Sequence, residues 1–152
     1  MKKIVLLACV LVSFVFGGNN VPVVDNALYQ KECTSCHFGY QPALLSKASW
    51  EKVMGGLNEH FGTDASLSKE DTSTLLGYLV ANAGNSKITR GNDTIYISRS
   101  PYFIKEHRDI SPRLISQKEV GSISNCIACH IRADEGSYRS RDIFIPNYRK
   151  WK

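Results

Sequence analysis

The alternation of apolar and polar side chains is most regular in residues 50–61. Six side chains there follow the i, i+3, i+4, i+7 spacing that places them on one face of a helix: Trp50, Val53, Met54, Leu57, His60 and Phe61. Ser49, just before this stretch, stands at the position of a helix N-cap. The pattern therefore predicts a helix over residues 50–61, with His60 directed to the same interior face as Trp50.

Two further helices are predicted on either side of this one. Residues 25–36 begin at Asp25, a residue type that caps helices, and lead into the first pair of cysteines. Downstream, Ser68 and Asp71 resemble a capping box ahead of a leucine-rich run, and Gly84 is suited to end that helix. Three helices would make a compact first half.

The pattern changes after residue 84. Residues 85–100 are rich in Gly, Asn, Ser and Thr, with a turn signal at residues 91–93 between two short β-prone runs, which predicts a linker that holds a small hairpin. Ser100 and Pro101 then suit the start of a short helix, because serine is a good cap and proline is favoured at the first helical position. Pro112 is expected to interrupt this helix.

The last third of the chain is less regular. Ser116 and Glu119 form another capping-box pattern, which predicts a helical approach to Cys126. The tail, residues 142–152, is basic and aromatic without strong periodicity, and we expect it to wrap the second half as irregular chain. The fold class predicted is mainly α, with short helices and a small hairpin in the second half.

The first residues have the three parts of a secretory signal peptide: two lysines, an apolar run over residues 4–16, and small residues at 17 and 18. This run is shorter than the roughly 20 residues that cross a bilayer, so we predict cleavage after Gly17 and a periplasmic protein with no transmembrane span in the mature chain. Lipid anchoring at Cys9 is the less favoured alternative, because only five apolar residues precede it. The predicted domains are residues 18–85 and 86–152.

Charge is unevenly divided between these two halves. Residues 18–86 hold 4 Lys and Arg against 7 Asp and Glu, whereas residues 87–152 hold 13 against 7, a net charge of +6. The asymmetry could orient the molecule toward an acidic partner, although an ordinary solvated surface explains it equally well.

The four cysteines beyond the signal peptide lie in two copies of the pattern C-x-x-C-H, at Cys33-Cys36-His37 and at Cys126-Cys129-His130. In this pattern the two thiols add to the two vinyl groups of haem, and the histidine becomes the proximal iron ligand. Two covalently bound c-type haems are therefore predicted. Each half has about 65 residues, a marginal size for a core, and a haem would act as an internal staple.

Other uses of paired cysteines fit less well. A thioredoxin-like pair would need an α/β setting, and a two-disulfide framework does not explain a histidine after each pair. Zinc or iron–sulfur ligation by four cysteines is disfavoured, because the 89 residues between Cys36 and Cys126 exceed the usual spacing and both histidines stay unexplained.

The remaining histidines are the candidates for the second axial ligands. His60 lies 23 residues after His37, and His107 lies 23 residues before His130, so the simplest pairs are His37 with His60 and His107 with His130. Crossed pairing stays open, and Met54 is a rival to His60 on the first haem, because Met/His ligation is common in cytochromes c. Histidine on both sides would leave no free position on either iron, which favours electron transfer.

Several blocks of the chain resemble the small dihaem cytochrome c family of bacteria: LYQKECTSCHFGYQPALL, SWEKVMGGLNEHFG, LLGYLVANA, SPYFIKEHRDI and VGSISNCIACHIRADEG. The resemblance implies a periplasmic electron carrier with two bis-histidine haems, a first half similar to a class I cytochrome c and a less regular second half. It implies that Cys33, Cys36, His37 and His60 serve one haem and that Cys126, Cys129, His130 and His107 serve the other. Relatives are associated with an oxygen-binding monohaem cytochrome c or with membrane b-type cytochromes, so a redox protein and no nucleic acid is the expected partner.

Two other functions compete with the carrier. One is a haem enzyme or gas sensor, peroxidase-like, in which one distal ligand leaves and Arg108, next to His107, assists charge in the opened pocket. The other is a structural haem module in a fixed complex. The chain is short for a substrate domain beyond two haem halves, which favours an electron carrier that is not an enzyme.

Overall fold

The computed structural model describes residues 20–85, 88–91 and 93–148 of the chain. The predicted signal peptide, residues 1–17, lies outside them. The described residues form five α-helices, five short 3₁₀ turns and no β-strand, so the mainly α fold class is confirmed. In this part of the chain no helix has the length and apolar character that crossing a bilayer requires.

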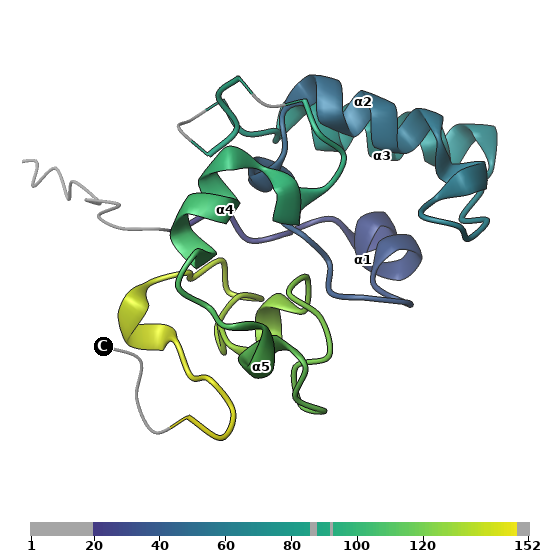
Figure 1. Cartoon of the computed structure of the whole chain (residues 1–152). Helices are drawn as coiled ribbons and strands as arrows, with labels where there is room; N and C mark the ends of the chain where they lie inside the picture. The colour runs from purple at the N-terminus through teal and green to yellow at the C-terminus, as the bar shows by residue number, and fades with distance from the viewer. Residues whose placement is uncertain (1–19, 86–87, 92, 149–152) are drawn as a thin grey trace, which may run out of the picture.

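Figure 1 shows α2 and α3 together at one end of the molecule and α5 with the C-terminal segment at the other, with α4 between them. The α-helices are α1 (Ala27–Cys33), α2 (Lys47–Gly55), α3 (Lys69–Ala81), α4 (Pro101–His107) and α5 (Pro112–Ile115). The 3₁₀ turns are Pro42–Leu44, Leu57–Glu59, Ile97–Arg99, Cys126–Ala128 and Ser140–Asp142.

The first half is built around α3, against which both α1 and α2 pack. The predicted cap at its start is confirmed: Ser68 Oγ accepts a hydrogen bond from the Asp71 amide at 3.0 Å and donates one to Asp71 Oδ2 at 2.8 Å. The three helices enclose a cluster of buried side chains: Tyr29, Leu45, Trp50, Met54, Leu75 and Leu79. This cluster is the main core of the described residues.

Several predicted helix boundaries in this half were wrong, and the first helix ends at Cys33 instead of residue 36. Asn26, not Asp25, caps α1, and its Oδ1 accepts from the Tyr29 amide at 2.8 Å. Ser46, not Ser49, caps α2. The third helix ends at Ala81 with Asn82 as its C-cap, before Gly84.

The largest departure is at the end of α2. This helix stops at Gly55 because two successive glycines each cost about 1 kcal/mol in a helix interior, so the predicted helix over residues 50–61 is divided. His60 lies beyond the break in a tight turn, where its carbonyl accepts from the Thr63 amide at 3.0 Å. Phe61 and Gly62 in this turn have φ of 52° and 87°.

The predicted hairpin is also absent from the described residues of segment 85–100. Residues 88–91 form turns, and Asn92 of the predicted turn lies outside the described residues. Asp93 is bonded to α2 instead, because its Oδ1 accepts from Ser46 Oγ at 3.0 Å and its carbonyl accepts from Lys52 Nζ at 3.2 Å. The segment is thus held by the first half and not by pairing with itself.

In the second half, the helix capped by Ser100 is confirmed as α4, whereas the helical approach to Cys126 was wrong. Ser116 is the C-cap of α5, and the chain continues in turns as far as Gly121, whose φ is +70°. A positive φ suits glycine and does not continue a helix. Cys126 instead opens a 3₁₀ turn.

The two halves are connected near both ends of the described chain. The Val21 amide donates to the Gly136 carbonyl at 2.9 Å, and Asn20 forms an isolated bridge with Ser137. Gly136 has a φ of +73°, and a Cβ placed on it would run into the Val21 carbonyl. The N-terminal segment therefore packs against the second half at a position that only glycine suits.

Gly136→Ala tests this contact. The added methyl group meets the Val21 carbonyl and the backbone keeps a left-handed conformation, so we expect the free energy of unfolding to fall by about 1–3 kcal/mol. The matched control is Gly77→Ala at an exposed position of α3, where an added Cβ meets nothing. We expect this substitution to raise the free energy of unfolding by up to about 1 kcal/mol. Denaturant unfolding followed by circular dichroism measures both, and equal effects of the two substitutions would contradict the account.

Candidate haem-binding sites

Two cavities lie in the described part of the molecule, and each gathers one C-x-x-C-H motif and one further histidine. The N-terminal cavity, of about 560 Å³, is lined by Cys33, Cys36, His37 and His60 among others. The C-terminal cavity, of about 240 Å³, is lined by Cys126, Cys129, His130 and His107 among others. The uncrossed grouping that sequence proximity predicts is the one that the fold brings together.

The N-terminal cavity lies between α1, α2 and the turn that holds His60. Cys33 is the last residue of α1, and Trp50 and Met54 reach the cavity from α2. Trp50 is fixed there because its Nε1 donates to the Pro42 carbonyl at 2.8 Å. The walls are otherwise mainly apolar and aromatic, as a porphyrin requires.

The two histidines of the N-terminal cavity face each other. The centres of the His37 and His60 rings are 6.2 Å apart, and the rings are inclined by 26°. His37 Nδ1 lies 2.8 Å from the Phe38 carbonyl, so Nδ1 carries the proton and Nε2 is left as the ligand atom. Burial, and then the neighbouring His37, lower the pKa of His60, which favours the neutral imidazole that binds a metal.

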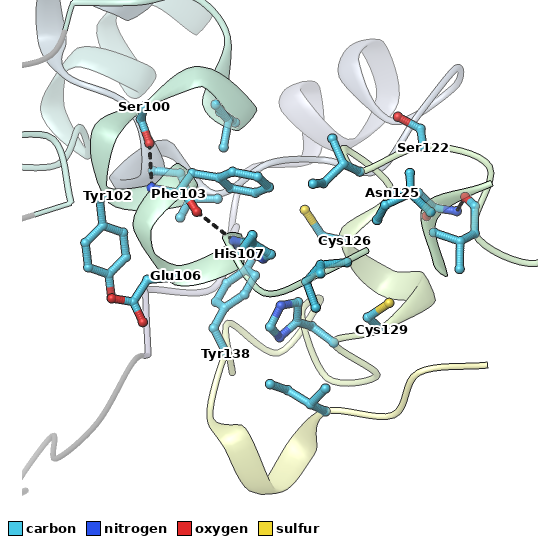
Figure 2. A pocket seen from close by; sticks show the side chains of 18 of the residues that line it. Ser100, Tyr102, Phe103, Glu106, His107, Ser122, Asn125, Cys126, Cys129 and Tyr138 are labelled. Carbon is cyan, nitrogen blue, oxygen red and sulfur yellow. Dashed lines mark hydrogen bonds between the residues drawn. The ribbon is translucent and has the colours of Figure 1, made fainter. Parts of the chain in front are cut away.

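The C-terminal cavity is closed on one side by α4 (Figure 2). His107, the last residue of this helix, places Nδ1 2.9 Å from the Phe103 carbonyl and stacks on the Phe103 ring, with ring centres 3.9 Å apart. Its Nε2 is therefore the free nitrogen. In Figure 2 Cys126 and Cys129 lie across the cavity from the α4 side chains.

His130 completes this second pair. Its ring centre is 6.0 Å from that of His107, with 71° between the ring planes. Burial, and then His107, lower the pKa of His130 to about 4, so the ring is neutral. Its Nδ1 is buried and has no hydrogen-bond partner among the described residues, so His130 lacks the Nδ1–carbonyl contact that orients His37 and His107.

The distances within both pairs fit an iron between two imidazoles. A metal–nitrogen bond of about 2 Å and a further stretch of about 1.1 Å from nitrogen to ring centre, counted on both sides, give about 6.2 Å between ring centres. The observed values are 6.2 and 6.0 Å. Each pair therefore lies at the spacing that one shared iron requires.

The burial of Cys33 and Cys126 suits an uncharged thioether better than a thiolate. No disulfide joins the four described cysteines, and burial raises the pKa of the Cys33 and Cys126 thiols to about 11 each. A thioether to haem is uncharged and tolerates this burial, whereas zinc and iron–sulfur sites need thiolates. Among the described residues, no three His, Cys, Asp or Glu side chains gather as a metal-ion site.

Three residues that the sequence did not single out lie between the two cavities. Tyr40 lies beside His37, with ring centres 5.3 Å apart, and Tyr138 lies beside His130 at 5.2 Å. The buried Gln41 joins the two tyrosines across the interface of the halves. Nothing in the local pattern marks these positions, because their partners are more than 80 residues away in the chain.

A mainly α chain with two C-x-x-C-H motifs, each in an apolar cavity with a second histidine, defines a c-type cytochrome with two haems. The chain belongs to the dihaem cytochrome c family, whose model matches residues 29–138. This range includes both motifs and both further histidines. No curated protein matches the chain.

Solved structures agree with this family. A dihaem cytochrome c from Rhodobacter sphaeroides is 38% identical, with a TM-score of 0.70 over 78% of this chain and 100% of that one. A dihaem c-type cytochrome from Shewanella baltica OS155 is 32% identical, with a TM-score of 0.74 over 86% of this chain and 100% of that one. The protein is therefore a haem-containing cytochrome with two covalently bound c-type haems and iron.

If each histidine pair binds one iron, the angles between the rings predict two different signals in the electron paramagnetic resonance spectrum of the oxidised protein. Nearly parallel rings, as in the pair at 26°, separate the energies of two iron d orbitals and give an ordinary rhombic low-spin signal. Rings near perpendicular, as in the pair at 71°, leave these orbitals close in energy and give a signal with one large g value. Two superimposed rhombic signals would contradict the ring orientations.

Proposed function

We propose that the protein is a periplasmic electron-transfer protein whose two haems are low-spin and have histidine on both faces. His37 and His60 bind one iron, and His107 and His130 bind the other. Cys33 and Cys36 attach the first haem and Cys126 and Cys129 the second. The observation that carries the proposal is the 6.2 and 6.0 Å spacing of the two histidine pairs inside cavities that also hold the motifs.

Such haems suit electron transfer better than substrate chemistry. An iron with two protein ligands has no free position for a substrate, and it keeps the same ligands in both oxidation states. When bound, each haem supplies a one-electron couple, and histidine in place of methionine lowers its potential. Both cavities are lined mainly by apolar side chains, although Cys36 and His37 of the N-terminal cavity are exposed.

The same spacing weighs against the other ligand assignments. Met54 lines the N-terminal cavity, but it also belongs to the buried core cluster with Trp50 and Leu79, where methionine is a common filler. His60 instead faces His37 across the cavity. Crossed pairing is disfavoured because each distal histidine already lies about one iron-binding span from the proximal histidine of its own half.

A haem enzyme or gas sensor has less support from the side chains. Arg108, the residue that was expected to assist charge in an opened pocket, does not line the C-terminal cavity. Its side chain is 68% exposed and lies 3.6 Å from the Asp109 carboxylate. Among the described residues, no arginine or lysine lines either cavity, so neither offers a positive charge to a bound peroxide or anion.

The partner in this proposal is another redox protein. The net charge of +6 in residues 87–152 supports docking of the second half against an acidic surface, because complementary charge raises association rates. An oxygen-binding monohaem cytochrome c or a membrane b-type cytochrome is the partner that the family resemblance suggests, and nucleic acid is not expected. Export by the signal peptide places the encounter in the periplasm.

Substitution of the distal histidines tests the ligands. His60→Ala and His107→Ala should each convert one of the two haems to a high-spin spectrum, because that iron loses one strong ligand. Met54→Leu is the matched control in the N-terminal cavity and should leave both haems low-spin, since leucine conserves volume in the core. Absorption and electron paramagnetic resonance spectra of the oxidised proteins report the spin states. A high-spin haem in Met54→Leu, or two low-spin haems in either alanine variant, would overturn the assignment.

A further inference from the structure

A continuous set of side chains connects the proximal histidine of one cavity with that of the other. We name Tyr40, Gln41 and Tyr138 the inter-haem bridge. Its first ring, Tyr40, lies 5.3 Å from the His37 ring, and its last ring, Tyr138, lies 5.2 Å from the His130 ring. The proximal sides of both sites therefore face the same interface between the halves.

Gln41 connects Tyr40 with Tyr138 in the middle of this bridge. It follows Tyr40 directly in the chain, and its Oε1 accepts a hydrogen bond from the Tyr138 hydroxyl at 2.6 Å. Its Nε2 donates to the Ala133 carbonyl in the second half. The side chain is only 1% exposed, so both ends of a buried amide are paired across the interface. This arrangement fixes the positions of the two tyrosines relative to each other.

Tyr40 makes a second, shorter connection between the sites. Its hydroxyl donates to the Ser124 carbonyl at 2.8 Å, and the same carbonyl accepts from the Cys126 amide at 3.1 Å. Ser124 lines the N-terminal cavity, whereas Cys126 lines the C-terminal cavity. One tyrosine thus contacts the iron ligand of the first site and the backbone next to the attachment cysteine of the second.

We propose that the inter-haem bridge couples the two haem sites and sets the rate at which an electron passes between them. The inference rests on the proposed electron-transfer function and deepens it. Such an exchange would oxidise one iron and reduce the other by the same electron, while both tyrosine hydroxyls stay in their hydrogen bonds to Ser124 and Gln41. Tyr40, Gln41 and Tyr138 act as positioning residues that hold the two proximal ligands in a connected path.

Nuclear magnetic resonance of the partly reduced holoprotein measures this exchange. Haem-methyl signals report the oxidation state of each haem. In the wild type we expect each signal of the one-electron form to lie between its oxidised and reduced positions, because the electron moves faster than the signals differ in frequency. A dilution series separates exchange within one molecule from exchange between molecules, since only the latter depends on concentration.

Tyr40→Phe and Tyr138→Phe remove one hydroxyl each and keep both rings. We expect broadened or separate haem-methyl signals in the one-electron form, which correspond to a severalfold slower exchange, while the fully oxidised and fully reduced spectra stay as in the wild type. That second readout separates loss of coupling from a general distortion of the sites. Tyr78→Phe on α3 is the matched control, because Tyr78 lines neither cavity, and it should leave the exchange unchanged.

The outcomes distinguish this inference from the function on which it rests. Unchanged exchange in both bridge variants, equal slowing in Tyr78→Phe, or a wild type without averaged signals would overturn the bridge. Failure of the carrier itself would appear earlier, as high-spin haem or irreversible reduction of the wild type. Because the two bridge variants alter opposite halves, either one that retains both haems is sufficient for the test.

Discussion

The structure depends on one constraint, which is that two imidazole rings must face each other across a cavity at about one iron-binding span. The first pair joins a loop after α1 to the turn after α2, and the second joins the end of α4 to the turn after Cys126–Ala128. Each pair therefore joins two segments whose histidines lie 23 residues apart in the sequence. Iron–histidine bonds and two thioethers would act there as the internal staples on which small domains rely.

The two halves differ in how much their packing depends on the haem. In the first half α1, α2 and α3 enclose a core of six buried side chains, and this core forms one wall of the N-terminal cavity. In the second half the buried hydrophobic side chains that the structure describes are Val120, Cys126, Ala133 and Ile145, and its helices are short. A bound haem would therefore supply much of the apolar interior of the second half. Hydrogen bonds of Gly136 and Gln41 attach this half to the better packed first half.

The sequence was sufficient for the features that depend on local chemistry. The helix caps at Ser68 and Ser100 and the mainly α class follow from neighbouring residues, and the spacing within the two motifs is enough to predict covalent haem. The break at Gly55 was missed because the apolar period continues across it. Tyr40 could not be found, since its partner Ser124 is 84 residues away and no local pattern records that contact.

In the proposed carrier both irons are closed by two strong protein ligands each. The most direct measurement is the absorption spectrum of the reduced holoprotein before and after addition of carbon monoxide. The account predicts an unchanged low-spin spectrum, because neither histidine pair leaves a position for the gas. A rapid spectral shift in half or all of the haem absorbance would contradict it and would point to gas binding or catalysis at an open iron.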